Sequence, residues 1–139
     1  MKSLCAFLSV CFLLLIQACT ESPTDATPKG AFSYSSYDSL GTTVAKGWFT
    51  MIASDSGSIS GEWHFTRVAT SDAIGPQIGS GVLVGGISNG HTWLELNPSF
   101  ADNNLQLVGT FDGISYSGQW YWTTYIGVTN HGTFEAHRQ

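Results

Sequence analysis

The amino-acid sequence predicts an all-β fold: a single eight-stranded antiparallel up-and-down β-barrel that follows a signal peptide and a short disordered linker. Apolar and polar residues alternate with a period of two, and no long helical pattern occurs after residue 29. Turn residues separate the alternating segments, and short turns alternate with longer connections. A two-sheet β-sandwich is the alternative, and it predicts a less regular alternation of loops.

The period of two is clearest in residues 59–66. Ile59, Trp63 and Phe65 fall on one face of an extended strand, while Glu62 and His64 fall on the other. Residues 116–123 repeat the same pattern, x-Ser-Gly-Glu/Gln-Trp-x-aromatic-Thr, 57 residues further along the chain. The similarity indicates either a weak internal repeat or two amphipathic strands that satisfy the same pleat independently.

Turn signals divide the domain into eight expected strands. Asn89-Gly90 and Asp112-Gly113 favour tight type I′ hairpins, and Ser56-Gly57 occupies an equivalent place. Longer segments are expected near 37–43, 69–79, 98–103 and 124–129, so tight turns should lie at one end of the barrel and long loops at the other. The expected strands are 30–36, 44–53, 58–68, 80–88, 91–97, 104–112, 114–123 and 130–137.

Closure of these strands into a ring removes exposed sheet edges. Glycines within the strands, at 47, 61, 85 and 118, suit the bends of a small barrel. An even number of strands starts and finishes the domain at the same end, which is the tight-turn end. The mouth with the long loops should therefore face away from whatever the N-terminal residues are attached to.

The first nineteen residues resemble the signal peptide of bacterial lipoproteins. Lys2 precedes an apolar run of about a dozen residues, too short to span a membrane. The run ends in Ile16-Gln17-Ala18-Cys19, which resembles a lipobox. The resemblance implies cleavage after residue 18 and a lipid on Cys19, and Thr20 then favours the outer membrane if the host has two. An ordinary secretory signal with a free Cys19 thiol is the alternative.

Three segments follow from this assignment: a signal peptide over 1–18, a lipidated cysteine with a flexible linker over 19–29, and a β-barrel domain over 30–139. The linker is rich in Thr and Pro and has no large apolar residue. Cys5 and Cys11 lie in the signal peptide, so the domain is expected to have no disulfide and no cysteine nucleophile. The segment Lys46 to Trp63 resembles the first hairpin of avidin-like and other calycin barrels, which implies architecture but brings no biotin-binding residues.

Composition argues against several functions. The chain has a formal net charge of −5 and only 5 basic residues, a poor match to a nucleic-acid phosphate backbone. The four histidines show no metal-ligand spacing, and no catalytic triad or phosphate-binding glycine loop is present. We therefore expect no catalysis, no cofactor and no metal.

Inward-pointing aromatic residues are the candidate ligand site. They either fill the barrel or line a cavity for one small apolar or amphipathic ligand. Arg67 is expected on the same, inward face of its strand, near the mouth. There it would either bind the carboxylate or phosphate of a ligand or remain a rim residue. The candidate residues are Trp63, Arg67, Phe111, Tyr116, Trp120, Trp122 and Phe134.

Taken together, these features predict a non-catalytic binding module in the cell envelope, held outside the cytoplasm by a lipid on Cys19. The first expectation is a small apolar or amphipathic ligand. The alternative is an envelope protein partner, as for a protease inhibitor or a structural surface lipoprotein, and it predicts exposed aromatic residues such as Trp48, Trp93, Tyr121 or Tyr125.

Overall fold

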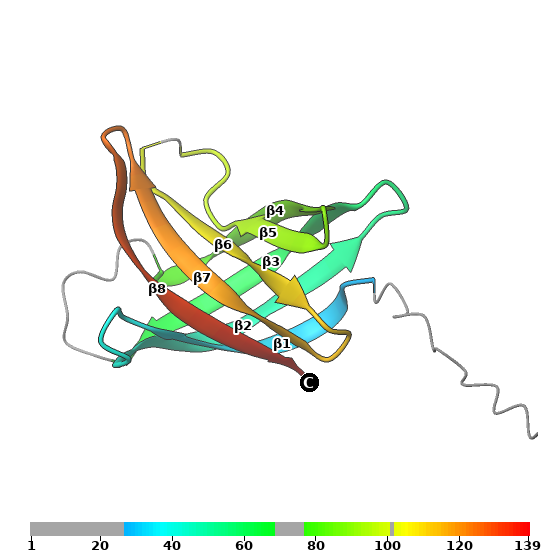
Figure 1. Cartoon of the computed structure of the whole chain (residues 1–139), viewed down its shortest axis with the longest axis horizontal. Helices are drawn as coiled ribbons and strands as arrows, with labels where there is room; N and C mark the ends of the chain where they lie inside the picture. Colours follow the sequence, from blue (N-terminus) through cyan, green and yellow to red (C-terminus); the bar gives the residue numbers. More distant parts are fainter. Residues whose placement is uncertain (1–26, 69–76, 101) are drawn as a thin grey trace, which may run out of the picture.

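The computed structural model describes residues 27–68, 77–100 and 102–139, and in this part of the chain it contains eight β-strands and no helix (Figure 1). Cys19, the signal peptide and most of the expected linker lie outside the described residues. The strands are β1 (Lys29–Tyr37), β2 (Thr43–Ala53), β3 (Ser58–Arg67), β4 (Gly79–Ser88), β5 (His91–Glu95), β6 (Asn104–Phe111), β7 (Ser115–Thr124) and β8 (Gly127–Arg138).

The strands form a closed antiparallel barrel in the order β1 to β8, as the sequence predicts. Closure comes from β1 and β8, which pair from Phe32 opposite Arg138 to Tyr37 opposite Thr133. Every pairing of the sheet and every residue of the described core lies between Lys29 and Arg138, so this segment contains the contacts that it needs to fold without the residues before it.

The barrel has two different ends. At the turn end, the connections 54–57, 89–90 and 112–114 lie together with the start of β1 and the C-terminus (Figure 1). The opposite end, which we call the loop end, contains the β1–β2 and β7–β8 connections, the described residues of the β5–β6 connection, the end of β3 and the start of β4. The predicted placement of both chain termini of the domain at the tight-turn end is therefore confirmed.

One expected loop is wrong. The segment 124–129 is not a long connection, because β7 continues to Thr124 and β8 begins at Gly127. Only Tyr125 and Ile126 join them. Thr123 pairs with Val128 and Thr124 with Gly127, and a register shift beside Trp122 accommodates the extended hairpin. Gly127 has a φ of 104°, which only glycine adopts readily and which allows the tight reversal.

Side-chain parity separates the core from the outer wall. In β3 the buried side chains Ile59, Trp63 and Phe65 alternate with exposed Glu62 and His64, as expected from the pattern. The other strands add their inward residues to one continuous hydrophobic cluster. Its further members are Phe32, Tyr34, Val44, Phe49, Met51, Leu83, Leu94, Leu96, Leu105, Leu107, Tyr116, Trp120, Phe134 and Ala136.

Glycine is required where the curved strands approach one another most closely. A Cβ at Gly47 would overlap the carbonyl oxygen of His64, and one at Gly61 would overlap that of Thr50. Both glycines occupy inward positions on paired strands. The absence of a side chain at these positions lets the sheet bend sharply enough to close around a narrow core.

The two similar sequence segments lie in β3 and β7, four strands apart around the ring. The indole Nε1 of Trp63 donates a hydrogen bond to the carbonyl of Leu96, just beyond β5, at 2.7 Å. Trp120 donates in the same way to the carbonyl of Tyr37, at the end of β1, at 2.8 Å. Each indole therefore reaches the loop end of the strand two positions further around the barrel, so the two segments have equivalent geometry.

Candidate functional site

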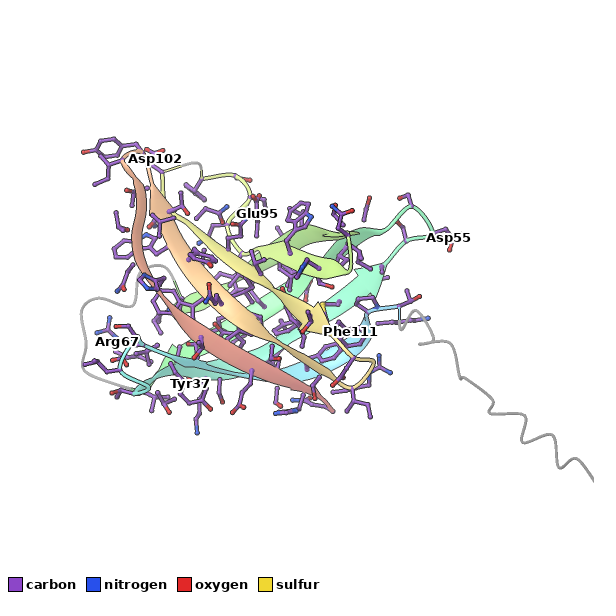
Figure 2. The ribbon with its side chains drawn as sticks, viewed as in Figure 1. Tyr37, Asp55, Arg67, Glu95, Asp102 and Phe111 are labelled. Atoms are coloured by element: carbon purple, nitrogen blue, oxygen red, sulfur yellow. The ribbon has the colours of Figure 1, made fainter. Side chains whose placement is uncertain are left out.

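The candidate residues from the sequence come together inside the barrel, with one exception. Trp63, Tyr116, Trp120 and Phe134 are buried members of the core cluster. Arg67 is exposed at the last position of β3, opposite Ala45, and Figure 2 shows it at the loop end. Phe111 and Trp122 are partly buried and pack against the core.

The inward aromatic rings contact one another. Tyr34 stacks on Phe65 with ring centroids 4.0 Å apart and planes at 6°. Tyr116 meets Phe134 edge to face at 4.8 Å, and Phe49 lies 6.4 Å from Tyr116. These separations are typical of directly packed rings. These contacts therefore occupy the part of the interior that surrounds Tyr34, Phe65, Tyr116 and Phe134.

A small polar cluster lies among these rings. The buried carboxamide oxygen of Gln77 accepts hydrogen bonds from the Tyr34 hydroxyl at 3.1 Å and from Ser36 Oγ at 2.7 Å. The Tyr116 hydroxyl donates toward the carbonyls of Thr92 and Leu107, at 3.0 and 3.1 Å. Polar groups that are buried in this way stabilise a fold only when they are paired.

Burial has a second consequence for the two core tyrosines. Desolvation raises the pKa of the Tyr34 phenol and of the Tyr116 phenol well above their ordinary value, because the charged phenolate is disfavoured away from water. Both hydroxyls therefore stay protonated near neutral pH, and neither is a candidate base. Sequence parity placed Tyr116 inward but singled out neither Tyr34 nor Gln77. A lone Gln between a loop and a strand gives no signal of burial.

The turn end of the interior is covered by a cation. The guanidinium of Arg138 lies 5.7 Å from the ring centroid of Phe32 and 5.8 Å from that of Phe111. These distances are typical of cation–π contacts, which stabilise a partly exposed pair by about 0.5–1 kcal/mol. Figure 2 shows Phe111 at the end opposite Arg67. Phe111 therefore has a packing partner at the turn end and does not lie at the mouth.

The loop end exposes large apolar side chains. Leu40 in the β1–β2 connection is 89% exposed, Phe100 in the β5–β6 connection is 65% exposed, and Tyr125 in the β7–β8 turn is 87% exposed. Ile126 next to Tyr125 is 73% exposed. Most of the Phe100 side chain is therefore in contact with solvent. We call Leu40, Phe100, Tyr125 and Ile126, which lie on three separate connections at this end, the loop-end cluster.

The titratable groups of residues 27–68, 77–100 and 102–139 form no candidate metal site. No group of three His, Cys, Asp or Glu side chains among these residues is placed to hold a metal ion. In the same ranges, no helix is long and apolar enough to cross a membrane. His137 is near Glu135, at 4.0 Å, on the exposed outer wall of β8.

Comparisons with known proteins assign the chain to no family. No family model matches the chain, no curated protein matches it, and no solved structure matches it.

Proposed function

We propose that this chain is a lipid-anchored protein of the cell envelope that acts outside the cytoplasm and binds another protein through the loop-end cluster. The proposal combines the lipobox-like segment ending in Cys19 with the exposed apolar residues at the far end of the barrel. Binding, rather than catalysis, is favoured because the sequence contains no nucleophile-elbow motif and no phosphate-binding glycine loop.

The direction of the barrel supports this arrangement. β1 begins at the turn end (Figure 1). A lipid attached to Cys19 would therefore lie on the same side of the barrel as the turn end. Two or more acyl chains hold a protein stably at a membrane, because each buried methylene contributes about 0.8 kcal/mol. The loop end would then point away from the membrane, toward other envelope components.

The exposure of the loop-end cluster is the single observation on which the partner depends. Large apolar side chains on the tips of loops cost free energy in water and release it when a partner covers them. Aromatic residues such as Tyr125 and Phe100 are enriched at the energetic centres of protein interfaces. An interior ligand is less well supported, because Tyr34, Phe65, Tyr116 and Phe134 already pack against one another.

The anchor is tested by metabolic labelling with palmitate in a bacterial expression host. We expect label on the chain and recovery in the membrane fraction, and we expect Cys19→Ala to lose both. A Cys11→Ala variant is the matched control, because this cysteine lies within the signal segment. Equal labelling of the Cys19→Ala chain would exclude the lipid anchor.

The partner is tested by photo-crosslinking in intact cells with a benzoylphenylalanine at position 126, and with the same probe at position 114 as control. Ile126 and Ile114 are both isoleucines with similar exposure, 73% and 69%, but they lie at opposite ends of the barrel. We expect a discrete crosslink to an envelope protein at 126 and none at 114. Crosslinks of equal yield at both positions, or none at 126, would contradict the proposal.

A further inference from the structure

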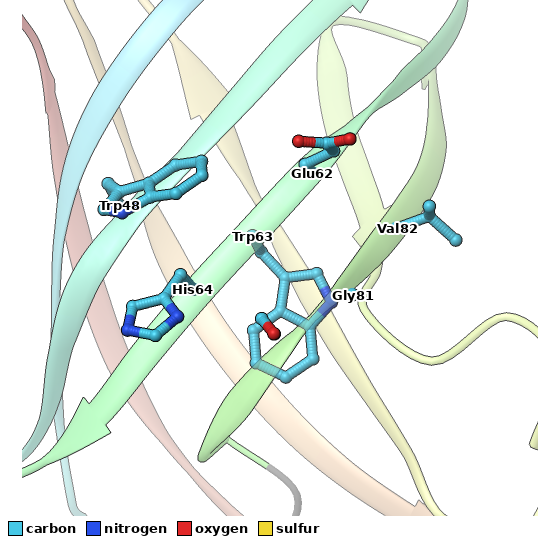
Figure 3. A pocket seen from close by; sticks show the side chains of 7 residues that line it. Trp48, Glu62, Trp63, His64, Gly81 and Val82 are labelled. Carbon is cyan, nitrogen blue, oxygen red and sulfur yellow. The ribbon is translucent and has the colours of Figure 1, made fainter.

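A groove crosses the outer wall of the barrel over β2, β3 and β4 (Figure 3), and it shares no residue with the loop-end cluster. It has a volume of about 460 Å³ and is open to solvent. This volume lies within the range of pockets that bind small molecules. Its lining includes Trp48, Glu62, Trp63, His64, Ser80 and Gly81.

Strand register brings the polar and aromatic groups of the groove side by side. Trp48 pairs with His64, and His64 pairs with Ser80, so the three side chains form one row across three strands. The Trp48 and His64 rings lie nearly parallel, with planes at 23° and centroids 6.2 Å apart. Trp48 is 39% exposed, which is unusual for so large an apolar side chain on a strand.

Gly81 lies against the Trp63 indole at one side of the groove. A Cβ at this position would lie 3.2 Å from Nε1 of Trp63, so the indole directly behind the strand leaves little room for a side chain. In Figure 3, the Trp63 ring lies beside Gly81, between Glu62 and His64 on one side and Val82 on the other. Trp63 is only 3% exposed, so the accessible aromatic surface of the groove comes mainly from Trp48, while the rim carries a carboxylate, an imidazole and a hydroxyl.

These polar side chains are free to bind a ligand. Among the described residues, the side chains of Glu62, His64 and Ser80 form no hydrogen bond or ion pair with another protein group. The groove lining has one carboxylate and no Lys or Arg, which disfavours phosphates and carboxylates as ligands. A ligand that matches the lining is uncharged, has one apolar face for an indole and has several hydroxyls for the rim.

We propose that this groove binds a neutral carbohydrate. One sugar ring would place its C–H face on Trp48 and direct its hydroxyls to Glu62, His64 and Ser80. This site is separate from the loop-end cluster, so it goes beyond the proposed protein partner and does not depend on it. The open groove predicts weak, millimolar affinity for a single disaccharide, because much of the ligand would remain in water.

The test is a titration of the isotope-labelled segment 27–139 with cellobiose, maltose and N,N′-diacetylchitobiose, followed by NMR. The chain has five tryptophans, so the Trp48 indole signal can be observed separately after assignment. At least one of the three sugars should shift the Trp48 signal in a saturable way. The absence of a shift with all three would overturn the proposal.

Two alanine variants test whether sugar binding depends on Trp48. Trp48→Ala should weaken sugar binding about ten-fold or more, whereas Trp93→Ala should leave it within about two-fold. Trp93 is the matched control because it lies on the outer wall of β5, outside the groove. Equal weakening by the two substitutions would contradict a site at Trp48.

Glu62→Gln separates a neutral sugar from a cation. The amide keeps the hydrogen-bonding capacity but removes the charge, so a sugar should still bind within about three-fold. Tetramethylammonium serves as the cation probe, because exposed indoles also attract cations. Saturable binding of tetramethylammonium that Glu62→Gln abolishes, without any effect of the sugars, would replace the carbohydrate site by a cation site.

Discussion

The β3 and β7 segments have equivalent inner faces but different outer faces. Trp63 and Trp120 are both buried, and each donates its indole hydrogen to a carbonyl at the loop end. Each also faces a glycine on the next strand, Gly81 or Gly132. The inner faces are alike because both must fill the same narrow interior.

The outer faces are not constrained in this way. On β7, the Tyr121 hydroxyl donates to the side chain of Gln119, so the polar groups of that wall satisfy one another. On β3, the corresponding Glu62 and His64 border the groove and have no such partners among the described residues. The difference indicates that packing determines the inward-facing residues of this barrel. The outward-facing residues of two similar segments are free to acquire separate roles.

The largest expected effect comes from removing either buried indole. Trp63→Ala and Trp120→Ala should each lower the free energy of unfolding by about 3–5 kcal/mol, because each leaves a large cavity and an unpaired carbonyl. Urea unfolding of the two variants measures this. Equivalent packing predicts similar losses, and a difference above about 2 kcal/mol would show that the two halves of the core are not equivalent.

Alanine substitutions at the two glycines that face the indoles should destabilise the protein to different extents. A Cβ at Gly132 would overlap the Tyr37 carbonyl oxygen and lie 2.7 Å from Trp120 Nε1, whereas one at Gly81 would meet only the Trp63 ring, at 3.2 Å or more. We expect Gly132→Ala to cost about 1–3 kcal/mol and Gly81→Ala less than about 1 kcal/mol. Thermal unfolding of both variants tests the order. A larger loss for Gly81→Ala would contradict the geometry.

Tyr116 introduces a pH dependence that Ile59, its counterpart in β3, lacks. Burial raises the pKa of Tyr116, so its stabilising contribution is complete below the ordinary tyrosine pKa and is lost as the pH rises above about 10. Tyr116→Phe should cost about 1–2 kcal/mol at pH 7 through its lost hydrogen bonds.

The measurement is urea unfolding of both proteins from pH 7 to pH 11. The destabilisation above pH 10 should be smaller in Tyr116→Phe than in the unsubstituted chain, which retains the titrating phenol. An unchanged alkaline slope would show that Tyr116 ionises in the folded protein as readily as in the unfolded one.

The smallest effects are expected on the outer faces. Glu62→Ala and Gln119→Ala should each change stability by no more than about 0.5 kcal/mol, because both side chains are exposed. Chemical unfolding compares the two. A loss of more than about 1 kcal/mol for Glu62→Ala would indicate that the groove side chain has a structural role, and it would weaken the case for a binding role.

Much of the fold was predictable because its determinants are local. Alternation in residues 59–66 identified the buried face, and Asn89-Gly90 and Asp112-Gly113 identified tight turns. The β7–β8 connection was not predictable in this way, because Thr123, Val128 and Thr129 give no sign of whether the hairpin continues. Its length depends on pairing between the two strands, which only the register reveals.

The same distinction between local sequence patterns and contacts between strands applies to the candidate sites. The inward parity of Trp63, Tyr116, Trp120 and Phe134 was correct, but whether they lined a cavity depended on their packing across the barrel. The groove was not found from the sequence, since Trp48, His64 and Ser80 belong to three strands and meet only through the register of β2, β3 and β4.

We propose that the protein's own rings pack against one another in the interior and that binding takes place on the outer surface. This proposal is tested most directly by nuclear Overhauser measurements on the natively purified chain. We expect contacts between the rings of Tyr34 and Phe65, whose centroids lie 4.0 Å apart, and no contact between Trp120 and a non-protein molecule. Absent Tyr34–Phe65 contacts, together with signals that join Trp120 to a retained ligand, would contradict it.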